Sequence, residues 1–256
     1  MNSIFYKPRK RLMIIYTGGT IGMIRNPETG ALETFNFDHL CKHVPEINEF
    51  GYAIHNYQFD PPIDSSDMCP ELWAHLVKII DYNYDSFDGF VILHGTDTMA
   101  YTAAALSFML ENLGKPVILT GSQLPIGVLR TDGKENLLTA IELAAAQDKD
   151  GHPMVPEVCV FFGQYLYRGN RCTKSNSEHF NAFSSYNYPP LAKTGININY
   201  NPANIRQVAA SQPFSPHYEA DAGVVALTLF PGIKKELIEN VMQMDGIKGI
   251  ILRTYG

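Results

Sequence analysis

The stretch M-I-I-Y-T-G-G-T-I-G-M at residues 13–23 joins an apolar run to a small polar cluster, in which Thr17 and Thr20 flank a glycine pair. Beside glycines, a plain turn would use Asn, Asp or Pro. Similar apolar runs recur along the chain, and most have consecutive apolar residues, as strands covered on both faces of a sheet do. The runs are LMIIYT (12–17), GFVILH (89–94), KPVILT (115–120), EVCVFFG (157–163), AGVVALTLF (222–230) and GIIL (249–252).

Helical patterns lie between these runs. The alternation predicts an α/β fold with a mostly parallel sheet flanked by helices. A proline in the first turn favours the start of the first helix, and a glycine followed by proline favours the end of the second. The predicted helices cover 70–82, 98–112, 132–147 and 233–244.

The composition excludes some function classes. The 256 residues carry a formal net charge of −6 at pH 7, which argues against a nucleic-acid or anionic-membrane partner. No apolar run approaches the roughly 20 residues that span a bilayer. The N-terminus has charges but no apolar core with a cleavage site, so we expect no signal peptide and a cytoplasmic location. The cysteines lack zinc-site spacing, so we expect free thiols at Cys41, Cys69, Cys159 and Cys172.

We predict two domains joined by a connection. Residues 1–200 form the N-terminal domain, 201–219 the connection, and 220–256 the start of a smaller, Rossmann-like α/β C-terminal domain. The final strand–helix–strand unit cannot bury both faces of its own sheet. It either joins the main sheet or belongs to a domain that is incomplete in this chain. The end of the chain directly after a strand favours a truncated domain.

Three predicted strands end in small polar clusters, T-G-G-T (17–20), H-G-T-D-T (94–98) and T-G-S-Q (120–123). In open α/β sheets, ligands bind outside the carboxyl ends of the strands. One cluster alone could be a helix cap, as Asp97 and Thr98 would be, but three at equivalent places indicate a site. No G-x-G-x-x-G, P-loop or G-x-S-x-G motif accompanies them. We interpret His94, at the strand end before Gly95, as a structural histidine that hydrogen-bonds the backbone.

A hydroxyl nucleophile with a non-histidine base fits the remaining residues. A threonine hydroxyl attacks a carbonyl only when a neighbour takes its proton, and a lysine can do so where desolvation and nearby dipoles lower its pKa. Lys174, in R-G-N-R-C-T-K-S-N (168–176), is the candidate base. Taken singly, a lysine in a loop is more often a solvated charge.

Four motifs together resemble the bacterial L-asparaginases of the cytosolic type I branch, and the resemblance runs from about residue 10 to the C-terminus. It implies a two-domain α/β enzyme, a homodimer or homotetramer, that hydrolyses L-asparagine to L-aspartate and ammonia without a metal or organic cofactor. The motifs are T-G-G-T-I-G (17–22), D-S-S-D-M (64–68), H-G-T-D-T-M-A-Y-T (94–102) and R-G-N-R-C-T-K (168–174).

The resemblance also implies roles for the catalytic residues. Thr20 is the nucleophile that becomes acylated, and Thr17 supports the turn. Thr96 and Asp97 form a second catalytic group with Lys174. Asp97 also binds the substrate's α-amino group, and Thr96 positions the attacking water or the polarised amide.

The D-S-S-D-M motif corresponds to the family's substrate-binding loop. Asp64, Ser65 and Ser66 match it, and Ser65 is the expected partner of the substrate's α-carboxylate. A helix-capping role for the serines or Asp67 competes with this interpretation, and the role of Ser66 stays open. The resemblance further suggests an effector site that includes Thr173 and Arg253.

Other polar residues near the strand ends leave two interpretations open. Ser122 and Gln123 either line the pocket or form the turn before Pro125. Arg130 and Asp132 are interpreted as structural.

The sequence departs from the family pattern in two respects. Many members carry a tyrosine on the mobile loop after T-G-G-T-I, but here the corresponding loop, 24–33, has none. Another hydroxyl fills that role, or Lys174 alone activates Thr20. Family members also extend well beyond this C-terminus. If 256 residues are the whole protein, we expect an incomplete site, weak assembly and poor activity.

Two alternative functions are compatible with the motifs. One is an amidase for another substrate, such as glutamine, or the amide-hydrolysing subunit of a tRNA amidotransferase, whose extra N-terminal sequence is absent here. The other is a non-catalytic amino-acid-binding module. The presence of both threonines, Asp97 and Lys174 argues against the second, because binding alone does not require a base.

Overall fold

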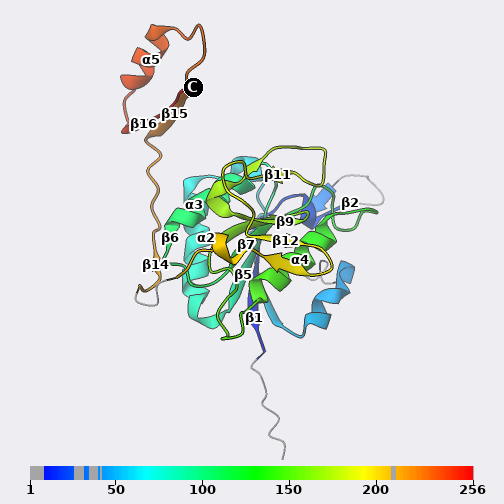
Figure 1. Ribbon diagram of the computed structural model, residues 1–256. Coiled ribbons are helices and arrows are strands. Elements are labelled where there is room, and N and C mark those ends of the chain that lie inside the picture. Colours follow the sequence, from blue (N-terminus) through cyan, green and yellow to red (C-terminus); the bar gives the residue numbers. More distant parts are fainter. Residues whose placement is uncertain (1–8, 26–31, 35–39, 41, 209–211, 256) are drawn as a thin grey trace, which may run out of the picture. The chain divides into compact units, whose positions relative to one another are not determined.

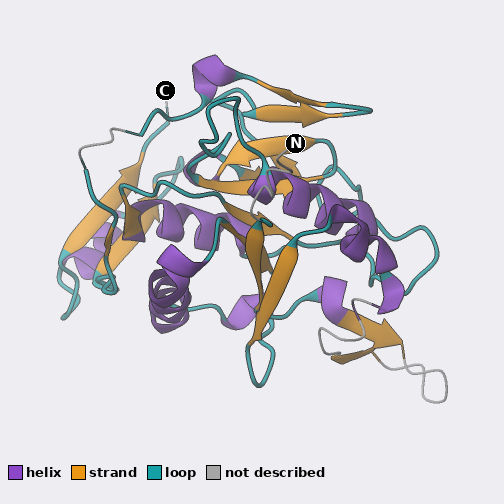
Figure 2. Ribbon diagram, turned by 90° about the horizontal axis from the view of Figure 1, so that it is seen from below, coloured by secondary structure: helices purple, strands orange, loops and turns teal. Residues whose placement is uncertain are grey.

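The computed structural model describes residues 9–25, 32–34, 40, 42–208 and 212–255; the others are drawn in grey (Figures 1 and 2). The chain divides into two compact units, Met1–Tyr218 and Glu219–Gly256. No helix in the described ranges is both long enough and apolar enough to cross a membrane.

The first unit is built on an eight-stranded sheet with the order β13-β12-β9-β8-β7-β5-β1-β4. The five strands from β8 to β4 are mutually parallel, and the last three at the other edge pair antiparallel. The predicted mostly parallel sheet is therefore confirmed. Its strands are β1 (Arg11–Tyr16), β4 (Ala53–Gln58), β5 (Gly89–Leu93), β7 (Val117–Thr120), β8 (Val158–Phe162), β9 (Tyr165–Arg168), β12 (Ala192–Thr194) and β13 (Ile198–Tyr200).

Three helices cover the sheet: α2 (Pro70–Asn83), α3 (Met99–Met109) and α4 (Gly133–Ala145). These three helices correspond to the predicted helices at 70–82, 98–112 and 132–147, but α3 ends earlier than predicted. Its chain passes into β6 (Leu110–Glu111), which pairs with β14 (Ser215–Pro216). The other short pairs are β2 (Met23–Arg25) with β3 (Leu32–Thr34), and β10 (Thr173–Lys174) with β11 (Phe183–Ser184).

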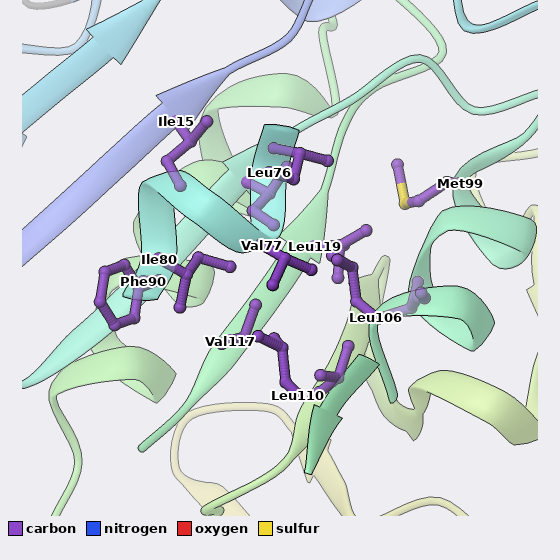
Figure 3. Close-up of a cluster of buried hydrophobic side chains, with 14 of the residues drawn as sticks. Ile15, Leu76, Val77, Ile80, Phe90, Met99, Leu106, Leu110, Val117 and Leu119 are labelled. Atoms are coloured by element: carbon purple, nitrogen blue, oxygen red, sulfur yellow. The ribbon is translucent and has the colours of Figure 1, made fainter. Parts of the chain in front are cut away.

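The core has two layers because successive side chains of a strand point to opposite faces of a sheet. Met13 and Ile15 of β1 pack with α2 and α3, and Leu12 and Ile14 pack with α4. Figure 3 shows the first layer, in which Leu76 and Ile80 of α2 meet the sheet. In Figure 1, α2 and α3 lie on one side of the sheet and α4 on the other.

Four strands of the sheet were not predicted from the sequence. β4, an edge strand, has His55 and Asn56 exposed, and its sequence AIHNYQ lacks both a continuous apolar run and strict alternation. β9, β12 and β13 are three or four residues long, and each includes positions that are only partly buried. Neither pattern distinguishes a short edge strand from a loop.

The predicted connection, 201–219, differs from the observed boundary. β14 pairs with β6, Ile205 is buried, and the Arg206 amide donates to the Glu157 carboxylate at 2.8 Å. Most of this stretch therefore packs on the first unit, whose compact part extends to Tyr218.

The second unit contains β15 (Val224–Thr228), α5 (Lys235–Met242) and β16 (Gly249–Arg253). β15 and β16 pair parallel with each other, so this predicted strand–helix–strand unit does not join the eight-stranded sheet in the described part of the chain. Membership of a larger, incomplete domain is not confirmed and stays a prediction.

Candidate active site

The sheet has a topological switch point between β1 and β5. The chain leaves β1 toward β4 on one side and then crosses to β5 on the other. Residues of the first connection pack on the α4 face, and α2, in the second, packs on the opposite face. A crevice outside the carboxyl ends of the strands is expected at such a point. The T-G-G-T and H-G-T-D segments both begin there.

The two segments touch through glycine backbone. Gly19 has φ 92°, and a Cβ added to it would lie only 2.5 Å from the Gly95 nitrogen. A glycine is required here both by the positive φ and by the close approach. Thr20 follows directly, partly exposed, at the start of a 3₁₀ turn, Thr20–Gly22. The contact brings the Thr20 and Thr96 segments side by side.

Replacing Gly19 with alanine is expected to destabilise the chain by about 3 kcal/mol, because strain at positive φ adds to overpacking. Gly51 is the matched control, since it has φ 66° and an added Cβ would meet nothing within 4 Å. The Gly51→Ala variant should lose only about 1 kcal/mol. Urea denaturation measures both losses, and equal losses would contradict the tight contact.

The two threonines of T-G-G-T differ in their surroundings. Thr17 is buried, and its hydroxyl donates to the Leu93 carbonyl at 3.0 Å, which ties the end of β1 to β5. Its backbone carbonyl accepts from the Ile63 amide at 2.7 Å. Thr17 thus supports the turn, as the resemblance implied, and its hydroxyl is committed to the backbone.

Lys174 contacts both polar side chains of the H-G-T-D segment. Its ammonium donates to Thr96 Oγ1 at 2.9 Å and to Asp97 Oδ1 at 2.6 Å. The Lys174 side chain is 18% exposed and that of Asp97 is 65% exposed. The lysine is therefore not a solvated loop charge. It reaches the carboxyl edge of the sheet on β10, which is held by pairing with β11.

The D-S-S-D-M segment adjoins the same loops. Ser65 is buried, its carbonyl accepts from the Thr98 hydroxyl at 2.6 Å, and a Cβ added to Gly95 would lie 2.5 Å from Ser65 Oγ. Asp64 and Ser66 are exposed. The Asp64 carboxylate accepts from the Ser66 amide at 2.8 Å and so caps the 3₁₀ turn Ser65–Asp67. Of the three, Ser65 is the one packed against the H-G-T-D segment.

The T-G-S-Q segment forms a turn held by its own hydrogen bonds. The Ser122 hydroxyl donates to the Leu124 carbonyl at 2.6 Å. The Asp132 carboxylate accepts from the amides of Gln123 at 2.9 Å and Leu124 at 3.1 Å. These bonds favour the structural interpretation of Ser122 and Asp132.

Several predicted features are not tested by this geometry. Thr173 is exposed next to Lys174, whereas Arg253 belongs to the second unit, so an effector site that combines them stays a prediction. Residues 26–31 of the loop without a tyrosine, and Cys41, lie outside the described residues. Cys69, Cys159 and Cys172 are free.

One chain of polar side chains next to the site, buried at His94 and Thr102, was not foreseen. His94 bonds the Gly95 carbonyl, as interpreted from the sequence, but it also contacts Thr102, which in turn contacts Trp73. Burial lowers the pKa of His94 to about 4. No group of three or more His, Cys, Asp or Glu side chains in the described ranges is arranged to hold a metal ion.

Comparison with known proteins identifies the family. Residues 11–206 match the family described as Asparaginase, N-terminal. The chain is 46% identical to L-asparaginase 1 of Escherichia coli (strain K12), over 97% of this chain and 71% of that protein. The structure resembles L-asparaginase I from Vibrio cholerae, with a TM-score of 0.84, 43% identity, and coverage of 97% of this chain and 73% of that one. It also resembles the probable cytoplasmic L-asparaginase from Campylobacter jejuni, with a TM-score of 0.79, 29% identity, and coverage of 97% and 76%. The family match and the identity both extend across the strand-end segments that meet at the switch point, and the chain belongs to the asparaginase family.

Proposed function

We propose that this chain is an amidohydrolase that converts L-asparagine to L-aspartate and ammonia through an ester on Thr20. The observation that carries the proposal is the contact of Lys174 Nζ with Thr96 Oγ1 and Asp97 Oδ1, next to the segment that bears Thr20. The L-asparaginases named among its relatives support asparagine as the substrate.

In the first step, the Thr20 oxygen attacks the side-chain amide carbon of the substrate, and the carbon–nitrogen bond breaks. The hydroxyl proton is transferred to the leaving nitrogen, which departs as ammonia, and an ester to Thr20 remains. The Thr17 hydroxyl is already bonded to Leu93, so Thr20 is the threonine of this turn available for attack. Neighbouring backbone amides can stabilise the developing oxyanion.

In the second step, water attacks the ester and Thr20 regains its proton as aspartate leaves. Thr96, held by Lys174, lies where it can orient that water, and the ion pair with Asp97 keeps the lysine in position. A carboxylate can accept several hydrogen bonds, so Asp97 can also bind the substrate's α-ammonium group. Ser65 is assigned to the α-carboxylate, with Asp64 and Ser66 at the exposed side of the loop.

A cytoplasmic location and a homodimer or homotetramer are part of the proposal. The name of the Campylobacter jejuni relative supports the location. The assembly rests on the resemblance alone, and analytical ultracentrifugation would measure it. An effector site that includes Thr173 and Arg253 is proposed on the same basis.

The proposal is tested by measuring ammonia release from L-asparagine and L-glutamine side by side. We expect faster release from asparagine, at a kcat/KM at least about tenfold higher. Faster release from glutamine would support the alternative amidase. Binding of asparagine in calorimetry without ammonia release would indicate a binding module.

A further inference from the structure

A hydrogen-bonded chain of three side chains, in which His94 and Thr102 are buried and Trp73 is partly buried, adjoins the proposed site. His94 directly follows β5, is 1% exposed, and precedes Gly95, Thr96 and Asp97. Its Nδ1 lies 2.7 Å from the Gly95 carbonyl, and its Nε2 lies 2.9 Å from Thr102 Oγ1. Trp73 Nε1 donates to the same hydroxyl at 3.0 Å. The chain thus links α2, α3 and the strand end.

The hydrogen-bonding partners of His94, Thr102 and Trp73 allow only one arrangement of the protons on these side chains. A carbonyl oxygen only accepts, so Nδ1 of His94 must carry the hydrogen that Gly95 receives. The indole N–H of Trp73 only donates, so the Thr102 oxygen accepts from it. With the buried imidazole neutral, Nε2 is an acceptor, and the Thr102 hydroxyl donates to it. Each named group then has a matching partner.

The hydrogen-bonded chain of side chains ends at a peptide group of the proposed site, the one that joins Gly95 to Thr96. The Gly95–Thr96 peptide is planar and trans, so its carbonyl and its N–H point to opposite sides. Because the carbonyl is bound by the imidazole, the Thr96 N–H is turned away from the core. The same glycine packs against Gly19 and Ser65, so the orientation of this one peptide affects all three loops.

We propose that His94 is a positioning residue: in the single tautomer set by the Gly95 carbonyl and the Thr102 hydroxyl, it holds the Gly95–Thr96 peptide and thereby keeps Thr96 beside Lys174. This rests on the proposed function, in which Thr96 and Lys174 act on the water and the ester. His94 does not touch the substrate, and its effect is transmitted through the carbonyl of Gly95.

The test removes the hydroxyl that donates to Nε2 of the imidazole. Thr102→Val keeps the shape of the side chain but leaves Nε2 of His94 without its donor. We expect kcat for asparagine to fall roughly 10- to 100-fold, as for small displacements of reacting groups, with KM changed less than about threefold. Thr102→Ser, which keeps a hydroxyl, should restore most of kcat.

Thr120→Val is the matched control. Thr120 is also fully buried, and its hydroxyl donates to the Phe161 carbonyl at 2.9 Å, outside the His94 chain. Its backbone carbonyl accepts from the His94 amide, a bond that the valine substitution leaves in place. Its kcat should stay within about twofold of the wild type. An equal loss in both valine variants would overturn the proposal, as would a Thr102→Val enzyme with unchanged kcat.

The imidazole ¹⁵N spectrum provides a readout that does not depend on turnover. Selectively labelled wild type should show His94 protonated at Nδ1 alone with Nε2 hydrogen-bonded, and Thr102→Val should keep this tautomer but lose the hydrogen-bond shift of Nε2. Protonation at Nε2 in the wild type would overturn the proposal. If the wild type released no ammonia, the proposed function would fail, and the spectrum alone would decide the role of His94.

Discussion

Thr20→Ala is expected to lower kcat for ammonia release from L-asparagine by roughly 10⁴-fold or more, because losing the nucleophile of a covalent mechanism removes the whole acylation route. Substrate affinity should change little, since the α-amino and α-carboxylate groups are assigned to Asp97 and Ser65. The measurement is steady-state ammonia release, together with calorimetric binding of L-aspartate to both proteins.

Two further observations sharpen this test. Thr20→Ser keeps a hydroxyl and should retain measurable turnover. Acid quenching of the wild type during turnover, followed by mass spectrometry, should show the peptide that contains Thr20 carrying the aspartyl group as an ester. Turnover by the alanine variant within tenfold of the wild type would remove Thr20 from its assigned role.

Lys174→Met is expected to lower kcat by roughly 10²- to 10⁴-fold, the range typical for the loss of a proton-transferring group. The free energy of unfolding should change by less than about 1 kcal/mol, because the Asp97 partner is mostly exposed and the ion pair is screened by water. Steady-state kinetics and urea denaturation measure the two effects separately.

Lys174→Arg should not restore activity, because a guanidinium stays protonated and has a different shape. Lys193→Met is the control: Lys193 is an exposed residue of β12 whose ammonium lies 5.6 Å from the Tyr165 ring centroid. The control should retain full turnover. Equal activity of the Lys174 and Lys193 variants would show that the contact with Thr96 has no chemical role.

The parts of the fold that could be predicted are those buried on both sides. The sequences of β5 and β8 are continuous apolar runs because helices cover both faces, and such runs are read from the sequence directly. β4 and β13 at the sheet edges carry exposed polar residues, so their strand character depends on neighbours distant in the chain. The early end of α3 has the same cause, because β14 lies about a hundred residues further along.

The candidate site likewise has a part that could be predicted from the sequence and a part that could not. The motifs allowed Thr20, Thr96, Asp97 and Lys174 to be named, since each stands in a short segment of recognisable composition. The role of Thr102 was not foreseen, because it depends on contacts with His94 and Trp73 across three elements. Hydrogen-bond direction in a buried chain requires the tertiary structure.

The position of Lys174 depends on the number of residues in the segment that leads to it from β9. After β9 the chain packs against α3, where a Cβ added to Gly169 would lie 2.8 Å from Ser107 Oγ in the last turn of the helix. It then returns toward the N-terminal end of that helix, where Lys174 meets Asp97. An inserted or deleted residue between these two fixed points would shift the amine along the helix by about 3 Å, out of reach of its partners. Evolution can therefore substitute side chains in this segment, but its residue count must stay constant while this contact is kept.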